Sequence, residues 1–300
     1  MFSRSQYRPA GATQRPAHMN APQKRNSLLC PNCRRLVSRS APACPYCGLK
    51  KPGSIWKDNI FTRVSGDDTS ILRLILIANI VMFVLSLAID PRATSFSGHP
   101  FGFLTPSNGS LLVLGATGSV PLFHYQNWWS LISASYLHGS LIHIVFNMIA
   151  LHQLGPLIIR EYGVSRTIVI YTVSGIGGYL ISALFGVRLT IGASAAVCGL
   201  IGAALYYGKS RGGTYGHAVY RQIGGWAVGI FIFGLLIPGI NNWGHGGGML
   251  AGAAIGAALG YQERIAETIR HKFLGTLCII VTGGVLLWSA VNGVLLLFFR

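Results

Sequence analysis

Seven long apolar segments follow one another along the chain after residue 70. They cover residues of about 71–89, 134–155, 166–186, 193–208, 222–240, 243–261 and 274–298. All but the shorter 193–208 are near the roughly 20 residues that a helix needs to cross a bilayer. Apolar runs of this length are typical of membrane helices. The pattern therefore predicts an all-α polytopic membrane protein with seven spanning helices.

The composition agrees with this prediction. Of the 300 residues, 51% are hydrophobic and only 10% are charged, with a mean hydropathy of +0.50. Soluble domains average about 25% charged residues. The first forty residues contain no apolar run of the kind found in a signal peptide, so we expect membrane insertion to begin with segment 71–89.

Lysine and arginine gather in alternate loops. If the N-terminus is cytoplasmic, the inner loops hold Arg160, Arg166, Lys209, Arg211, Arg221, Arg264, Arg270 and Lys272. The outer loops then hold only Arg92, Arg188 and the terminal Arg300. Because cytoplasmic loops carry an excess of positive charge, we expect an integral protein of a prokaryotic cytoplasmic (inner) membrane with its N-terminus in the cytoplasm.

The region before the first span is strongly basic. Residues 1–69 hold twelve lysines and arginines against three aspartates. Such an arm can bind nucleic acid, but directly before a membrane segment it more often faces anionic lipid on the cytoplasmic side. We therefore favour the lipid bilayer over nucleic acid as its partner.

Three parts are expected before the core: a disordered basic arm at 1–27, a zinc ribbon at 28–50 and a polar linker at 51–69. The ribbon is indicated by two Cys-x-x-Cys pairs, which are formed by Cys30, Cys33, Cys44 and Cys47. Four thiolates at this spacing are typical of a closed structural zinc site. Two disulfides are the alternative, but the cytoplasm is reducing. Nothing in the sequence identifies a partner for the ribbon.

The positions of the acidic residues exclude two kinds of membrane protease. All seven acidic residues are Asp58, Asp67, Asp68, Asp90, Glu161, Glu263 and Glu267. None lies at the centre of an apolar segment. An intramembrane aspartyl protease would need two such carboxylates, and a zinc metalloprotease would need a glutamate between its metal ligands.

A serine and a histidine at membrane depth remain as candidates for catalysis. Ser194 follows Gly192-Ala193 at the outer end of one span, and His245 lies in the first few residues of another span that runs in the same direction. Intramembrane polar residues are costly and usually functional. A neutral imidazole can activate a serine hydroxyl. With no carboxylate nearby to orient the imidazole, the sequence predicts a Ser–His dyad without a cofactor.

A third span supplies candidate donors for an oxyanion. His143 and Asn147 are one helical turn apart and therefore project together. With the backbone N–H of Ser194 they form a potential set of hydrogen-bond donors. His138 does not share their face, and we expect it to be a structural hydrogen-bonding group near the start of the helix.

Small residues allow the two catalytic helices to pack closely. One helix carries Gly248, Gly252, Gly256 and Gly260, and the other carries Ala195, Gly199 and Ala203. Ridges of small residues at a spacing of four let membrane helices approach each other. We expect these two ridges to face each other.

These residues resemble the rhomboid intramembrane serine proteases over about residues 71–261. The similarity rests on a His-x4-His-x3-Asn pattern from His138 to Asn147, on Leu154-Gly155, on Tyr162-Gly163, on Gly192-Ala193-Ser194 with Gly199, and on His245-x2-Gly248-x3-Gly252. The family's usual Gly-x-Ser-Gly reads Gly-Ala-Ser-Ala here, and its Trp-Arg pair reads Trp129-Ser130.

The resemblance implies a six-helix protease core at 70–261, followed by a connector and a seventh transmembrane helix at 262–300. It also implies cleavage of single-span membrane substrates near the outer leaflet. In this interpretation Ser194 is the nucleophile, His245 the base, and His143 with Asn147 the oxyanion donors. Two alternatives stay open: an inactive relative that binds membrane helices, and a transporter, although no inverted repeat is evident.

Overall fold

The computed structural model describes residues 26–30, 35–49, 51–53, 70–96 and 102–298. It divides into two compact units, Met1–Lys57 and Asp58–Arg300. The predicted arm lies almost wholly outside the described residues, as do Cys33 and most of the predicted linker.

The first unit is built around a two-stranded sheet. Strand β1 (Ser27–Leu29) pairs with β2 (Leu36–Ser38) in antiparallel register, with Leu28 opposite Val37. Among the described residues of this unit, the buried side chains of Cys30, Val37 and Cys44 form a small core. Small domains with few buried apolar side chains usually need a disulfide, a metal or a partner for stability.

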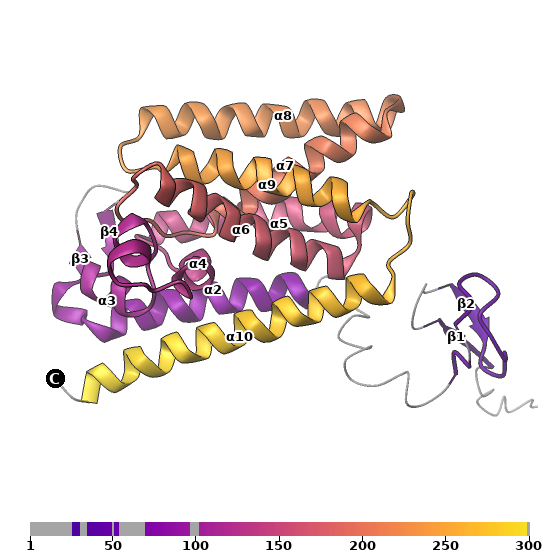
Figure 1. Ribbon diagram of the computed structural model, residues 1–300, viewed down its shortest axis with the longest axis horizontal. Helices are drawn as coiled ribbons and strands as arrows, with labels where there is room; N and C mark the ends of the chain where they lie inside the picture. The colour runs from indigo at the N-terminus through magenta and orange to yellow at the C-terminus, as the bar shows by residue number, and fades with distance from the viewer. Residues whose placement is uncertain (1–25, 31–34, 50, 54–69, 97–101, 299–300) are drawn as a thin grey trace, which may run out of the picture. The chain divides into compact units, whose positions relative to one another are not determined.

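The second unit is a bundle of long helices (Figure 1). They are α2 (Ser70–Ile89), α5 (Leu141–Tyr162), α6 (Val164–Leu184), α7 (Ser194–Arg211), α8 (Gly213–Leu236), α9 (Asn242–Leu259) and α10 (Ile269–Phe298). Five of them, α2, α5, α6, α8 and α10, are long and apolar enough to cross a membrane. The prediction of an all-α polytopic membrane protein is thereby confirmed.

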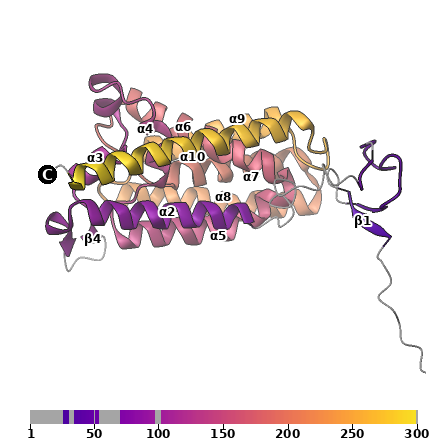
Figure 2. The same ribbon diagram turned by 90° about the horizontal axis from the view of Figure 1, so that it is seen from below.

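Helices α7 and α9 lie outside that group of five. Each has only 18 residues and is rich in glycine and alanine, which lowers its hydropathy. Both pack against α6 and against each other inside the bundle, and α8 packs on α7. Figure 2 shows α2 and α10 running alongside each other, and Figure 1 shows them on the opposite side of the bundle from α8. We therefore find α7 and α9 at the centre of the helical core.

Short elements connect α2 to α5. They are the turn η2 (Pro91–Ala93), the hairpin of β3 (Ser95–Phe96) with β4 (Phe103–Thr105), α3 (Asn108–Val113), η4 (Val120–His124), α4 (Ser130–Ser133) and η5 (Ala134–Tyr136). The long loop between the first two spans is thus mostly folded.

Several helix boundaries differ from the prediction, among them the end of α5, which lies at Tyr162 instead of near 155. Helix α5 begins at Leu141 instead of near 134, because Ser140 caps it by accepting a hydrogen bond from the backbone N–H of His143 at 3.3 Å. Helix α8 begins at Gly213 instead of near 222 and ends at Leu236. The residue that precedes Pro238 disfavours the helical conformation, so α8 stops there.

The two predicted ridges of small residues face each other. A methyl group on Gly248 would collide with the carbonyl oxygen of Ala195, and one on Gly252 with that of Gly199. Gly256 continues the row opposite the Cβ of Ala203. Gly260 does not take part: it ends α9 with a φ of +68°. Glycine therefore sets the close approach of α7 and α9 at two successive turns.

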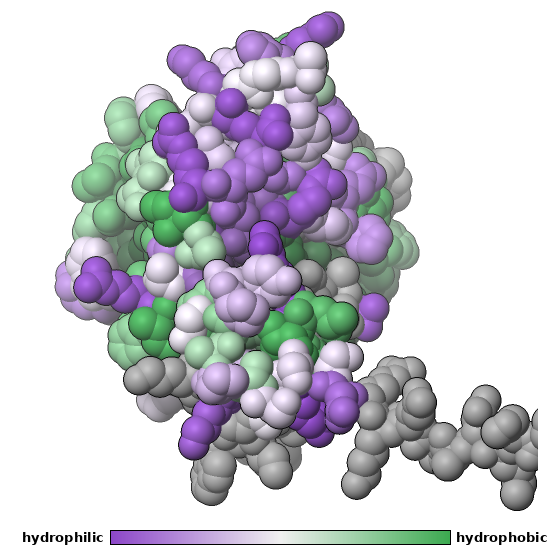
Figure 3. Space-filling model, turned by 90° about the vertical axis from the view of Figure 1, so that its right-hand side faces the viewer, coloured by the Kyte–Doolittle hydropathy of each residue, from purple (hydrophilic) through white to green (hydrophobic). Residues whose placement is uncertain are grey.

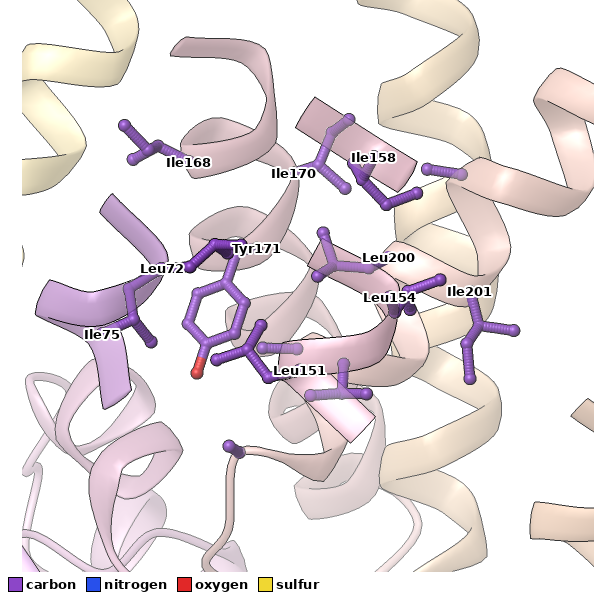
Figure 4. Packing of buried hydrophobic residues seen from close by; sticks show 14 of the residues in the cluster. Leu72, Ile75, Leu151, Leu154, Ile158, Ile168, Ile170, Tyr171, Leu200 and Ile201 are labelled. Carbon is purple, nitrogen blue, oxygen red and sulfur yellow. The ribbon is translucent and has the colours of Figure 1, made fainter. Parts of the chain in front are cut away.

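Packing of aliphatic and aromatic side chains fills the remaining interior. Figure 4 shows Tyr171 of α6 beside Leu72 and Ile75 of α2, with Leu151 of α5 nearby. Lipid tails are as apolar as leucine, so burial from lipid gains little by transfer alone. Dense van der Waals contact therefore carries the stability of this interior.

Polar residues mark the end of the bundle at which α7 and α9 finish. The upper part of Figure 3 views this end and shows hydrophilic side chains over it, with hydrophobic side chains towards the flanks. The basic side chains of Arg160 and Arg264 are exposed here, and Arg211 pairs with Glu263 at 2.8 Å. The opposite end, where α5, α7 and α9 begin, holds the predicted catalytic residues.

Candidate active site

Ser194 is the first residue of α7, and the chain enters that helix through a turn at Gly192. Gly192 has a φ of +125°, which side-chain-bearing residues rarely adopt. A Cβ atom at this position would also lie 2.7 Å from Nε2 of His143. Glycine is thus required twice, for the turn and for the close approach of the His143 ring to the start of α7.

The structure brings Ser194 and His245 together from helices that are distant in sequence. Nε2 of His245 lies 3.0 Å from Oγ of Ser194, a hydrogen-bonding distance between residues 51 positions apart. His245 is buried and Ser194 half-buried. Both lie at helix starts on the same end of the bundle, as the apolar pattern predicts. A hydroxyl held against an imidazole nitrogen is the arrangement that a nucleophile and its base require.

The other ring nitrogen of His245 is buried as well. Among the described residues, nothing forms a hydrogen bond with Nδ1. When Nε2 accepts the proton of Ser194, Nδ1 carries the proton of the neutral ring. The position of the His245 ring is therefore set by the packing of α9 and by its contact with Ser194.

His143 presents a hydrogen-bond donor to the same place. The backbone N–H of Gly139 donates to Nδ1 of His143 at 3.3 Å. A backbone amide cannot accept, so Nδ1 is the acceptor and the neutral ring carries its proton on Nε2. That nitrogen is the one that faces Gly192, two residues before Ser194.

Asn147 lies one turn after His143 on α5. Its side-chain amide donates to the backbone carbonyl of His143 at 2.9 Å. The side chain is buried, with 6% of its surface exposed. An amide nitrogen carries two hydrogens, so one N–H of Asn147 is used within the helix and the other remains for a ligand.

His138 differs from the prediction of a hydrogen-bonding group. It precedes α5, is fully buried, and packs edge-on against the ring of His143 with ring centroids 5.0 Å apart. Neither of its ring nitrogens has a hydrogen-bond partner among the described residues. Its contact with His143 is therefore one of ring packing, which holds the His143 ring in place.

Sequence reasoning missed two residues that hold the turn before Ser194. The hydroxyl of Tyr179 on α6 donates to the carbonyl of Gly192, and the N–H of Gly192 donates to the carbonyl of Ala134 at 2.9 Å. Asn241 caps α9 and reaches across to the same loop. A tyrosine inside an apolar segment needs a polar partner, and this was the available signal for Tyr179.

Three of the four predicted zinc ligands gather in the first unit. The sulfur atoms of Cys30, Cys44 and Cys47 lie within 4.8 Å of one another. The sulfurs of Cys30 and Cys47 are 3.7 Å apart, well beyond the roughly 2.05 Å of a disulfide. Two thiolates on a tetrahedral zinc ion, each with a Zn–S bond of about 2.3 Å, would lie about 3.8 Å apart. The described thiols therefore fit a metal site.

The second unit is similar in sequence to known proteins. Residues 125–262 match the model of the Rhomboid domain. The chain is 30% identical over 214 residues to RHOMBOID-like protein 6, mitochondrial, of Arabidopsis thaliana, covering 63% of this chain and 68% of that protein. It is 34% identical over 171 residues to Rhomboid protease GluP of Bacillus subtilis (strain 168), covering 54% of this chain and 33% of GluP.

A further relative is RHOMBOID-like protein 4 of Arabidopsis thaliana, 30% identical over 201 residues, which make up 61% of this chain. The chain spans 51% of the length of that relative and a third of GluP. The matched segments contain α5 to α9 and thus every residue of the site at the start of these helices. The chain belongs to the rhomboid family of membrane proteins.

Proposed function

We propose that this protein is an intramembrane serine endopeptidase that uses Ser194 and His245 as a catalytic dyad. The observation that carries the proposal is the 3.0 Å contact between Nε2 of His245 and Oγ of Ser194. Membership of a family that includes a named protease supports it. The close packing of α7 and α9 through Gly248 and Gly252 supports it as well, because it keeps the two side chains at a fixed spacing.

The reaction follows from the atoms at the site. Oγ of Ser194 attacks the carbonyl carbon of the scissile peptide, and its proton passes to Nε2 of His245. When the tetrahedral intermediate collapses, the carbon–nitrogen bond breaks and the imidazolium returns the proton to the leaving amine. A water molecule then attacks the acyl-enzyme by the same route, which releases the acid product and restores the hydroxyl of Ser194.

The oxyanion of the intermediate needs hydrogen-bond donors. We assign this role to Nε2–H of His143, to the second N–H of Asn147 and to the backbone N–H of Ser194. As the first residue of α7, Ser194 has an amide with no partner within its own helix. The contact from Gly139 keeps the proton of His143 on the nitrogen that faces the site. Preorganised donors of this kind are worth about 10²–10³ in rate each.

The substrates that fit this site are the transmembrane segments of single-span proteins. The dyad lies at the start of α7 and α9, and the basic side chains lie at the opposite end. With the basic end in the cytoplasm, cleavage would take place near the outer leaflet and the N-terminus would be cytoplasmic.

The test is cleavage of a model single-span substrate by the purified protein in lipid. We expect product from the wild type and none from Ser194→Ala or His245→Ala. Ser86→Ala is the matched control, because Ser86 is a buried membrane-helix serine whose hydroxyl, within the described part of the chain, donates to the carbonyl of Phe83 in its own helix. Cleavage that persists in both dyad variants would contradict the proposal.

The second candidate is an inactive rhomboid-like protein that binds membrane helices. Retention of both Ser194 and His245 at bonding distance favours the protease. The two candidates separate in one measurement: an inactive relative would capture the substrate without any product, and Ser194→Ala would leave that capture unchanged.

For the first unit we propose a structural zinc site formed by Cys30, Cys33, Cys44 and Cys47. Closed four-thiolate sites supply the folding energy that a small core lacks. We expect one zinc ion per chain by elemental analysis, and a cobalt-substituted protein with the absorption of tetrahedral thiolate ligation. A Cys44→Ser variant that retains a full equivalent of zinc would contradict this assignment, whereas Cys198→Ser should have no effect because Cys198 lies in α7.

A further inference from the structure

Asn241, directly before α9, holds three separate segments with one side chain. Its Oδ1 atom accepts the backbone N–H of Gly244 at 2.9 Å and so caps α9. Its Nδ2 atom donates to Oγ of Ser182 at 2.6 Å and to Oγ1 of Thr190 at 2.9 Å. Both amide hydrogens and the oxygen are therefore engaged. Because the Gly244 amide can only donate, the orientation of the Asn241 amide group is also determined.

Each of these bonds leads to the backbone near a member of the dyad or to α6, which packs against both α7 and α9. Gly244 directly precedes His245, whose own N–H donates to the carbonyl of Asn241 at 3.1 Å. Thr190 lies four residues before Ser194, in the loop that feeds α7. Ser182 is fully buried in the last turn of α6. Asn241 thus joins the backbone that carries the base to the loop that carries the nucleophile.

Thr190 is itself a fixed point in that loop. It forms an isolated antiparallel bridge with Thr117. The N–H of Thr117 donates to the carbonyl of Thr190 with an N···O distance of 3.1 Å, and the N–H of Thr190 donates to the carbonyl of Thr117 at 2.7 Å. Thr117 in turn accepts a hydrogen bond from the hydroxyl of Ser130 at 3.0 Å. Because Thr190 is held by its backbone, its hydroxyl is a rigid anchor for Asn241 and not a mobile loop group.

We propose that Asn241 is a positioning residue for the Ser194–His245 dyad, acting through the bond from its amide to the hydroxyl of Thr190. This inference rests on the proposed protease function. The physical reason is that α7 and α9 are joined near the site by packing of small residues, which fixes the distance between the helix axes better than the height of one helix start relative to the other. A directional bond between the two helix starts fixes that height.

The test uses Thr190→Val, which removes the hydroxyl and keeps the shape and the backbone bridge. We expect kcat, and the rate at which a fluorophosphonate labels Ser194, to fall about ten- to one-hundred-fold, the range that follows from sub-ångström to ångström misplacement of reacting groups. KM for a single-span substrate should stay the same, because Thr190 is buried, with 8% of its surface exposed. Thr167→Val is the matched control, because Thr167 is a buried α6 threonine whose hydroxyl donates, as far as the described residues show, to the carbonyl of Gly163 in the preceding turn.

A second variant separates positioning from helix capping. Asn241→Ala removes the cap of α9 as well as the hydrogen bond to Thr190, and it should lower the melting temperature. Thr190→Val should leave the melting temperature nearly unchanged. In the double variant, Thr190→Val should add nothing to the kcat loss of Asn241→Ala, since both remove one interaction. If Asn241→Ala does not fold, Asn241→Ser takes its place, because it keeps an oxygen that can cap α9 and removes the amide group that donates to Thr190.

Two results would overturn the inference: a wild-type kcat and labelling rate in Thr190→Val, or losses that add fully in the double variant. Failure of the proposed function is a different observation, namely cleavage that survives in Ser194→Ala. If Ser194→Ala is inactive while Thr190→Val is fully active, the proposed protease function stands and only the positioning role of Asn241 is contradicted.

Discussion

At the scale of single residues, the site depends on which atoms are already occupied. The backbone N–H of Gly139 donates to Nδ1 of His143, and one amide hydrogen of Asn147 is donated to the carbonyl of His143. What remains is one donor on each side chain. A donor fixed before the reaction costs nothing to reorganise when charge develops.

We therefore expect His143→Ala and Asn147→Ala each to lower kcat by about 10²–10³-fold with little change in KM, as loss of an oxyanion donor does. The measurement is steady-state cleavage of a single-span substrate in lipid. His152→Ala is the control on the same helix, because His152 is exposed and away from the site. Equal activity of the His143 and control variants would remove the oxyanion assignment.

The sequence singled out Ser194, His245, His143 and Asn147 as candidates because each is a polar residue at membrane depth near a helix start. It did not reveal the role of Asn241, since an asparagine before a helix predicts only a cap, and its bonds to Ser182 and Thr190 depend on tertiary packing. His138 was misjudged for the same reason. Its polarity suggested hydrogen bonds, but in the fold its ring packs against the ring of His143.

At the scale of elements, the contact between α7 and α9 is the one on which the dyad depends. Its register was predictable, because glycine and alanine at a spacing of four define a ridge on any straight helix. The starts of α5 and α8 were not predictable to within several residues. They depend on the Ser140 cap and on Gly212 and Gly213, which have positive φ angles of +66° and +65°.

A side chain at Gly252 should separate these helices. Gly252→Val would place a methyl group against the carbonyl of Gly199, and we expect a loss of about 1–3 kcal/mol in unfolding free energy, typical of overpacking, together with loss of cleavage. The comparison is Gly229→Ala on α8, where an added Cβ meets nothing within 4 Å. Thermal unfolding in detergent measures both, and equal melting temperatures would contradict the packing argument.

At the scale of the whole second unit, Arg166 fixes the connector between α9 and α10. Arg166 was predicted to lie in an inner loop, but it is the third residue of α6 and fully buried. Its guanidinium donates to the carbonyls of Gly260 and Ile265 at 2.7 and 2.8 Å. Its backbone N–H donates to the carboxylate of Glu267 at 3.1 Å. One arginine thus ends α9 and seats the last helix against the core.

Arg166→Met should release this connector, because the carbonyls that it satisfies lose their donors at about 1–3 kcal/mol for a buried group. Digestion by a glutamate-specific protease measures how accessible the connector is, since Glu263 and Glu267 lie in it and the only other glutamate in the sequence is Glu161. We expect faster cleavage after Glu263 and Glu267 in Arg166→Met. Arg270→Met, a change of an exposed arginine, should be cleaved at the wild-type rate. Equal cleavage rates in the two variants would contradict the role of Arg166 in holding the connector.

The most direct measurement of the central claim is mass spectrometry of the protein after reaction with a fluorophosphonate. The account predicts a single adduct on the peptide that contains Ser194, formed by the wild type and by Ser86→Ala. It predicts no adduct in His245→Ala, because the hydroxyl then has no base. An adduct that forms equally well without His245, or that maps to another serine, would contradict the dyad.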